Sequence, residues 1–146
     1  MAQLSFPVTK AGLTVPVWIG LSGETTDALL VAHQQPVLPV QARGLLDIAT
    51  DVTAVASWVL QQLGVPAIST ASTTTAGGPV TVNVYKLSLG ITDPGQPILT
   101  WLTWPNLLVT ELATVLPDAD VLIGLDVLLE CKLLLDGPAR HFTLEF

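Results

Sequence analysis

The sequence is poor in cysteine and in basic residues, and each shortage excludes a class of protein. Cys131 is the only cysteine, so the chain can form neither an intrachain disulfide nor a cysteine-based zinc site. Five Lys and Arg residues are scattered along the chain against 12 Asp and Glu, which gives a formal net charge of −7. Nucleic acids and anionic membranes are bound by clustered cations, so we expect neither as a partner. His33 and His141 have no second ligand at helical spacing, so we expect no metal site and no cofactor.

Long apolar runs are also missing. Pro, Gly, Gln and Asp interrupt every run well before the roughly 18 residues of a membrane-spanning helix. The N-terminus has no basic segment followed by an apolar core, so we expect no signal peptide and a cytoplasmic location. Half of the residues are apolar, 12% are charged and the mean hydropathy is +0.62. This composition argues against disorder and favours a single domain over residues 1–146 that has an apolar face for self-association.

Most of the sequence is typical of β-strands. The segments that predict strands are rich in β-branched, leucine and aromatic residues, and Gly, Pro, Asp or Ser-Thr clusters bound them. They are 13–21, 28–32, 43–47, 80–89 and 98–104. Asp136-Gly137 lies between two further strand-like runs and indicates a hairpin. Many strands with few helices favour an all-β fold that closes into a β-barrel.

Two short helices interrupt the predicted strands, at 57–63 and 124–130. Ser57 and Asp126 are the expected N-caps, and Gly64 followed by Pro66 ends the first helix. We expect Trp58, within the first helix, to be a core residue. Trp101 and Trp104 should face opposite sides of their strand, with one of them in the core.

Asp47 stands at the end of a predicted strand, within the stretch "GLLDIATDVTAV". Two further segments follow it: "TTTAGGPVTV" predicts a hairpin tip, and "VLIGLDVLLECKLLLDG" predicts a strand, a glycine and a short helix. In this order, the three segments resemble the retropepsin-like aspartic peptidases, particularly the small bacterial single-domain members. The resemblance extends from about Arg43 to Phe146.

This resemblance implies a retropepsin-like closed β-barrel with a flap hairpin, working as a homodimer on a peptide or protein substrate. Each subunit would supply one catalytic aspartate, Asp47, because no other acid has the required context. The two carboxylates would share one proton and activate a water between them. The family pattern also places Asp51 in contact with substrate and Gly77 and Gly78 at the tip of the flap.

The active-site loop departs from the family pattern. Asp47, Ile48, Ala49 and Thr50 stand where relatives have Asp-Thr/Ser-Gly-Ala. In those relatives the Thr or Ser hydroxyl donates across the dimer axis, and Ile48 has no hydroxyl. Ala49 places a methyl group where the family's glycine allows close approach.

Three functions are compatible with this sequence. The first is an aspartic endopeptidase that uses Asp47 of two subunits. The second is a catalytically weak or inactive relative that binds extended peptides. The third is a structural dimerisation module that uses the same surface. An acid at the end of a strand in an arbitrary sequence would have a turn or capping role, so Asp47 is distinguished by its flanking match alone.

Overall fold

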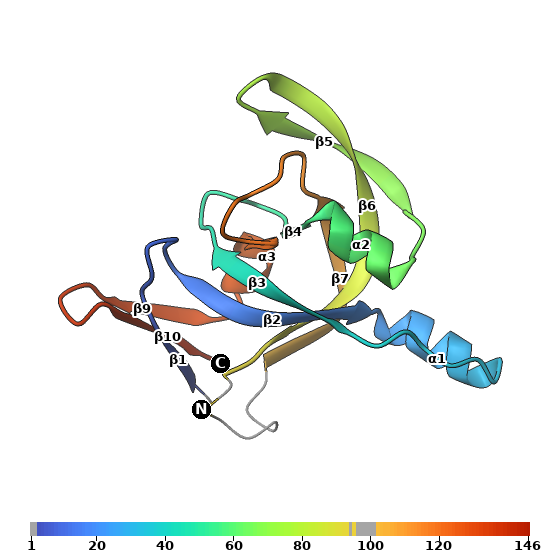
Figure 1. The fold of residues 1–146 in the computed structure, drawn as a ribbon, viewed down its shortest axis with the longest axis horizontal. Helices are drawn as coiled ribbons and strands as arrows, with labels where there is room; N and C mark the ends of the chain where they lie inside the picture. Colours follow the sequence, from blue (N-terminus) through green and yellow to red (C-terminus); the bar gives the residue numbers. More distant parts are fainter. Residues whose placement is uncertain (1–2, 94, 96–101) are drawn as a thin grey trace.

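A closed six-stranded β-barrel forms the centre of the fold, as the sequence predicts. The computed structural model describes residues 3–93, 95 and 102–146 (Figure 1). The barrel strands are β2 (Thr14–Leu21), β3 (Val40–Leu46), β8 (Val121–Ile123), β4 (Ala54–Val55), β7 (Leu102–Glu111) and β6 (Gly78–Ile91), in their order around the barrel. The ring closes because β2 pairs with both β3 and β6, and closure leaves these strands no free edge at the seam.

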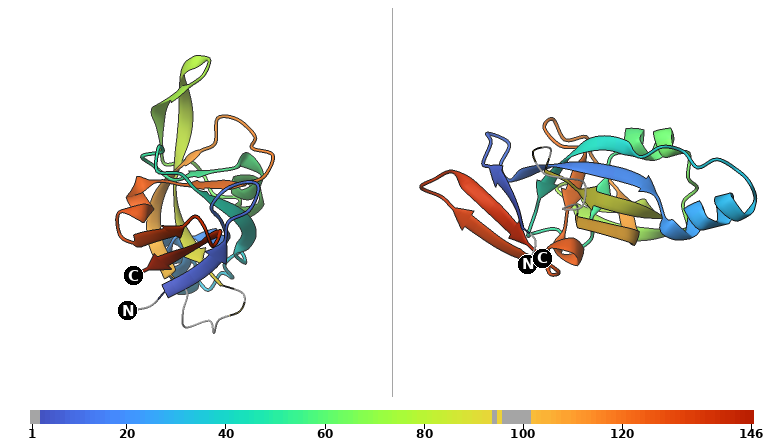
Figure 2. Two further views of the ribbon diagram at one scale, coloured as in Figure 1. Left: turned by 90° about the vertical axis from the view of Figure 1, so that its left-hand side faces the viewer. Right: turned by 90° about the horizontal axis from the view of Figure 1, so that it is seen from below.

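One further strand, β5 (Ser69–Thr75), pairs with β6 alone and lies outside the ring. β5 and the first half of β6 form a hairpin that projects from the barrel (Figures 1 and 2). Most of this hairpin is exposed, whereas the second half of β6 enters the barrel and buries alternate side chains, including Leu87 and Leu89.

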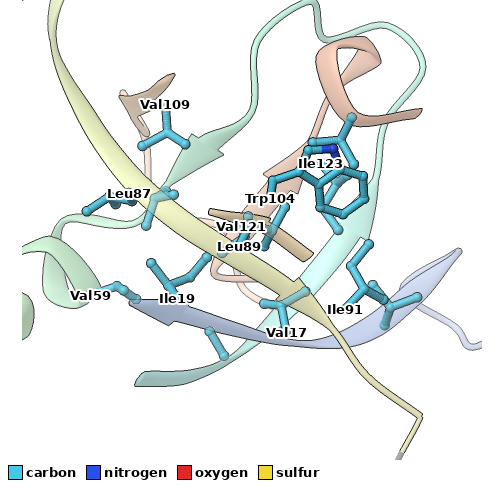
Figure 3. Close-up of a cluster of buried hydrophobic side chains, with 14 of the residues drawn as sticks. Val17, Ile19, Val59, Leu87, Leu89, Ile91, Trp104, Val109, Val121 and Ile123 are labelled. Atoms are coloured by element: carbon cyan, nitrogen blue, oxygen red, sulfur yellow. The ribbon is translucent and has the colours of Figure 1, made fainter. Parts of the chain in front are cut away.

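The barrel encloses an aliphatic core. Figure 3 shows side chains from strands far apart in the sequence meeting there, among them Val17, Leu89, Trp104 and Ile123. Full burial of one such aliphatic side chain contributes about 1.5–3 kcal/mol. Trp104 is thus a core residue, as predicted for one member of the tryptophan pair, while Trp101 and most of the strand predicted at 98–104 lie outside the described residues.

A second, three-stranded sheet packs beside the barrel (Figure 2). Its antiparallel strands are β1 (Gln3–Pro7), β10 (His141–Glu145) and β9 (Lys132–Asp136), with β10 in the middle. The rings of Phe6 and Phe142 lie 5.4 Å apart and belong to the same apolar core as the barrel side chains. The predicted hairpin at Asp136-Gly137 is present. Asp136 ends β9 and pairs with His141 of β10, and Gly137 is the first residue of the four-residue loop between them.

The structure contains a helix that the sequence did not predict. Residues 28–32 were expected to form a strand, and that prediction is wrong, because helix α1 spans Gly23–Val31. The hydroxyl of Ser22 caps it by accepting from the backbone N–H of Thr25 at 3.1 Å. Leu29 packs partly buried against the core, but no residue of α1 is fully buried, so the helix presents no broad apolar face of the kind by which a sequence reveals one.

The two predicted helices are present, but their N-caps differ from those expected. α2 spans Ser57–Leu63 with Ala56 at the N-cap, and Gly64 ends it in a left-handed conformation. α3 spans Leu125–Leu128, and its N-cap is Gly124 instead of Asp126. Among the described residues, no helix has the length and apolar character needed to cross a membrane.

Candidate functional site

Asp47 is the first residue after β3, and the barrel fixes its position. β3 runs parallel to β8, and the backbone N–H of Asp47 donates to the carbonyl of Ile123, the last residue of β8, at 2.9 Å. The aspartate therefore stands where two neighbouring strands end together, on a loop that leads to β4.

The loop itself orients the carboxylate of Asp47. Its Oδ1 accepts from the backbone N–H of Ala49 at 2.9 Å, and its Oδ2 accepts from the hydroxyl of Thr50 at 2.7 Å. Asp47 is half-buried, whereas the side chain of Ile48 beside it is 70% exposed. Thr50 thus supplies a hydroxyl to the aspartate from within the same subunit. The family resemblance gives this position no such role.

Buried hydrogen bonds fasten this loop to α3. The hydroxyl of Thr53, fully buried, donates to Asp126 Oδ1 at 2.8 Å and accepts from the backbone N–H of Gly124 at 3.1 Å. The backbone N–H of Leu125 donates to the carbonyl of Thr50 at 2.8 Å. Asp126, within α3, is therefore a structural link between the loop and the helix.

Gly124 is required by this close approach. A Cβ at this position would lie 2.7 Å from the carbonyl oxygen of Thr50 and 3.1 Å from the backbone carbon of Val52. Both neighbours are backbone atoms of the loop that carries Asp47, so they can give way only if the loop moves.

The predicted substrate-binding residues lie on two elements, the Asp47 loop and the β5–β6 hairpin. Asp51 is exposed on the same loop as Asp47, four residues further on. Gly77 and Gly78 lie at the tip of the β5–β6 hairpin, where Thr75 pairs with Gly78 and Gly78 has a φ of +107°. In Figures 1 and 2 the hairpin projects on the same side of the barrel as the loop that follows β3.

A cavity of about 380 Å³ adjoins the hairpin. Its lining includes Thr81 and Asn83 of β6 and Glu111 at the end of β7. Asp47 is not among the lining residues, so this cavity does not enclose the carboxylate within one chain. Within the described ranges, no three His, Cys, Asp or Glu side chains converge as metal ligands would.

Comparison with known proteins supports the architecture through structure alone. No protein-family model matches the sequence, and no curated protein does. The structure is similar to the crystal structure of a retropepsin-like aspartic protease from Rickettsia conorii, with a TM-score of 0.59 over 97% of this chain and 89% of that one. The chain has the retropepsin-like fold. At 12% sequence identity, the similarity extends to the fold and no further.

The structure also contains a charged cluster that the sequence analysis missed. Asp120, almost fully buried, accepts hydrogen bonds from the backbone N–H of Arg43 at 3.0 Å and from Arg43 Nε at 3.2 Å. Its other oxygen accepts from Trp58 Nε1 at 3.2 Å. Trp58 was expected in the core and that prediction is wrong, because the residue is 44% exposed and its Nε1 is bonded to Asp120.

Opposing effects set the protonation of Asp120. Burial raises the pKa of its carboxyl, but the hydrogen bonds from Arg43 and Trp58, with the positive charge of Arg43, outweigh burial, and the pKa lies below its usual value. At Cys131, burial and then the charge of Glu130 raise the pKa of the thiol, which keeps it protonated and poorly nucleophilic.

We expect Gly124→Ala to destabilise the protein by about 1–3 kcal/mol, because the added methyl group must displace backbone atoms. Urea unfolding at neutral pH measures the loss. Gly137→Ala is the matched control, since a Cβ there meets no atom within 4 Å. Equal stability of the two variants would show that the loop moves without cost.

We expect Asp120→Asn to lower the free energy of unfolding by about 1–2 kcal/mol at pH 7, because the N–H donors of Arg43 and Trp58 lose a charged acceptor. The loss is modest because Arg43 is exposed to water, which screens the ion pair. A carboxyl whose folded-state pKa is depressed stabilises the protein above its unfolded pKa, near 3.8 here, and the contribution is lost as pH falls through the folded value. Urea unfolding across this pH range should therefore show the wild-type advantage shrinking in acid. Asp118→Asn, at an exposed neighbour, serves as the control. An advantage independent of pH would contradict the assignment.

Proposed function

We propose that the protein is an aspartic endopeptidase in which Asp47 of two subunits activates a water between them. One observation carries the proposal: in a retropepsin-like fold, Asp47 stands at the end of a barrel strand with both carboxylate oxygens held by Ala49 and Thr50. A carboxylate so fixed is oriented before substrate arrives, as general acid–base chemistry requires.

A second subunit is needed for the chemistry. One ionised carboxylate takes a proton from the water, and a second, protonated one donates a hydrogen bond to the carbonyl of the scissile peptide. Two like charges at close range cannot both ionise cheaply, so the pair holds one proton. Within the described residues the carboxylate of Asp47 has no acidic group among its hydrogen-bond partners, and in this proposal the second carboxylate comes from another chain.

Exposed apolar side chains beside Asp47 support pairing at this surface. Ile48 is 70% exposed and Val52, on the same loop, is 41% exposed. Such residues next to a polar site are typical of an interface that a partner covers. In the terminal sheet, β10 already has β1 and β9 on its two edges, so a partner strand could extend this sheet only at β1 or β9.

Substrate would lie between the Asp47 loop and the β5–β6 hairpin. In this proposal the hairpin is the flap, Gly77 and Gly78 let its tip move, and Asp51 contacts the peptide main chain. The hairpin's β5 also has one unpaired edge, along which an extended peptide could add as a strand.

A non-hydrolytic peptide-binding protein is the second candidate. Ile48 favours it, because an exposed side chain without a hydroxyl stands where the family's cross-axis donor would be. In this case the protein would bind extended peptides without cleaving them.

Asp47→Asn should abolish hydrolysis and leave the fold intact, because an amide cannot take a proton from water. The assay incubates protein with a diverse peptide pool at about pH 4–7, with and without a pepstatin-type inhibitor, and reads cleavage by mass spectrometry. Asp27→Asn, at an exposed residue of α1, is the matched control. Light scattering of the same samples at micromolar concentration should show a dimer. Cleavage that persists in the Asn variant would place the chemistry elsewhere, and binding without cleavage in wild type would select the second candidate.

The double change Ile48→Thr, Ala49→Gly should raise peptidase activity at least about tenfold, equivalent to about 1.4 kcal/mol of transition-state stabilisation. The threonine restores a donor across the dimer axis, and the glycine removes a methyl group beside Asp47. Stability should stay constant or fall by up to about 1 kcal/mol, because glycine loosens the unfolded chain. kcat/KM on a cleaved peptide is the measurement, with each single variant as a control. An efficient wild type that the double change fails to improve would identify Asp-Ile-Ala-Thr as a working loop.

A further inference from the structure

A cavity of about 820 Å³ lies on the outside of the barrel, apart from the Asp47 loop. The turn between β1 and β2, strands β2 and β3, helix α2 and the segment before β8 form its walls. The volume is in the range of small-molecule sites, about 300–1,000 Å³. Asp47 is not among the lining residues, and Arg43, which is, precedes it by four residues, about 13 Å along an extended chain.

Trp58 gives this cavity a rigid aromatic wall. Its Nε1 donates to Asp120, whose other oxygen is held by Arg43, so the indole cannot rotate away without breaking a hydrogen bond. Even so, 44% of the residue remains exposed. A large aromatic ring that is both oriented and open to solvent is suited to stacking against a flat ligand.

Two cations in the cavity keep free hydrogen-bond donors. Arg43 uses Nε and Nη2 on Asp120, which leaves Nη1 without a partner among the described residues, and its side chain is 58% exposed. Lys10 is exposed and, within the described ranges, forms no ion pair. Two carboxylates also line the cavity: Asp120, whose charge is paired with Arg43 and whose oxygens accept from Arg43 and Trp58, and Asp118.

Arg43 and Asp120 are both charged in the free protein. The hydrogen bond to Asp120 raises the pKa of Arg43, and the pKa of Asp120 is lowered despite its burial. Displaced pKa values within a cleft are a feature of binding sites. Here the ion pair holds Arg43 in place, so little side-chain order is lost when a ligand binds.

We propose that this cavity binds a carboxylate carried by a flat aromatic group, with the ring on Trp58 and the carboxylate between Lys10 Nζ and Arg43 Nη1. Two sources share this chemistry: a free aromatic acid, and the C-terminal aromatic residue of a peptide. The site does not depend on the peptidase activity proposed for Asp47.

Isothermal titration calorimetry with matched probes tests the proposal. The small pair is 2-naphthoate and 2-naphthamide; the peptide pair is N-acetyl-Ala-Ala-Phe as its free acid and as its amide. An acid should bind at least about tenfold tighter than its amide. Binding of naphthoate would show that a free aromatic acid is enough to occupy the cavity. Binding of the peptide acid but not of naphthoate would identify the ligand as a peptide C-terminus. Equal affinity of acid and amide, or no binding of any probe at millimolar concentration, would overturn the proposal.

Variants locate the bound probe. Lys10→Gln and Trp58→Ala should each weaken acid binding at least about fivefold, while Trp58→Phe, which keeps a ring, should stay within about threefold of wild type. Lys132→Gln and Val115→Ala are controls that remove an exposed cation and an exposed apolar side chain elsewhere.

Asp47→Asn should bind the acid as wild type does, because the cavity excludes that residue. Circular dichroism checks each fold, and if Trp58→Ala unfolds, the exposed Lys10→Gln decides the result. Loss of binding in the controls, or in Asp47→Asn but not in Lys10→Gln, would refute the assignment.

Discussion

The candidate active site depends on the hydrogen bonds of the Thr53 hydroxyl. It is fully buried, donates to Asp126 and accepts from the backbone N–H of Gly124, so one side chain joins the Asp47 loop to both β8 and α3. A buried group with both its donor and its acceptor satisfied is costly to disrupt. The absence of a side chain at Gly124 lets the two segments meet closely enough for these bonds to form.

The parallel pair β3–β8 runs from the outer cavity at one end to the Asp47 loop at the other. At its beginning, Arg43 and Asp120 tie the strands together beside the outer cavity, and at its end Asp47 bonds to Ile123. A short parallel pair of this kind has few ladder bonds, so the side-chain and loop contacts at its two ends add substantially to its stability. The closed barrel holds this pair because β3 is also paired with β2 over most of its length.

Side chains near Asp47 differ in their burial. Thr53 is buried and donates to Asp126, whereas Asp51 and Ile48 are exposed. Thr50 stands between these groups, because its hydroxyl holds Asp47 while its carbonyl accepts from Leu125. The loop is thus anchored on one side and open on the other, an arrangement suited to an oriented carboxylate.

Local patterns in the sequence determined the strands at 13–21, 43–47 and 80–89, the helix at 57–63 and the place of Asp47 at a strand end, because alternation and turn residues act between neighbours in the chain. Helix α1 escaped prediction because only Leu29 packs against the core and no residue of the helix is fully buried, so it needs no apolar stripe. Trp58 and Asp126 were misassigned because their partners, Asp120 and Thr53, are 62 and 73 residues away. Arg43 and Asp120 likewise meet across 77 residues. Only the closed barrel brings such residues together, since their pairing depends on strand register and packing instead of on adjacent sequence.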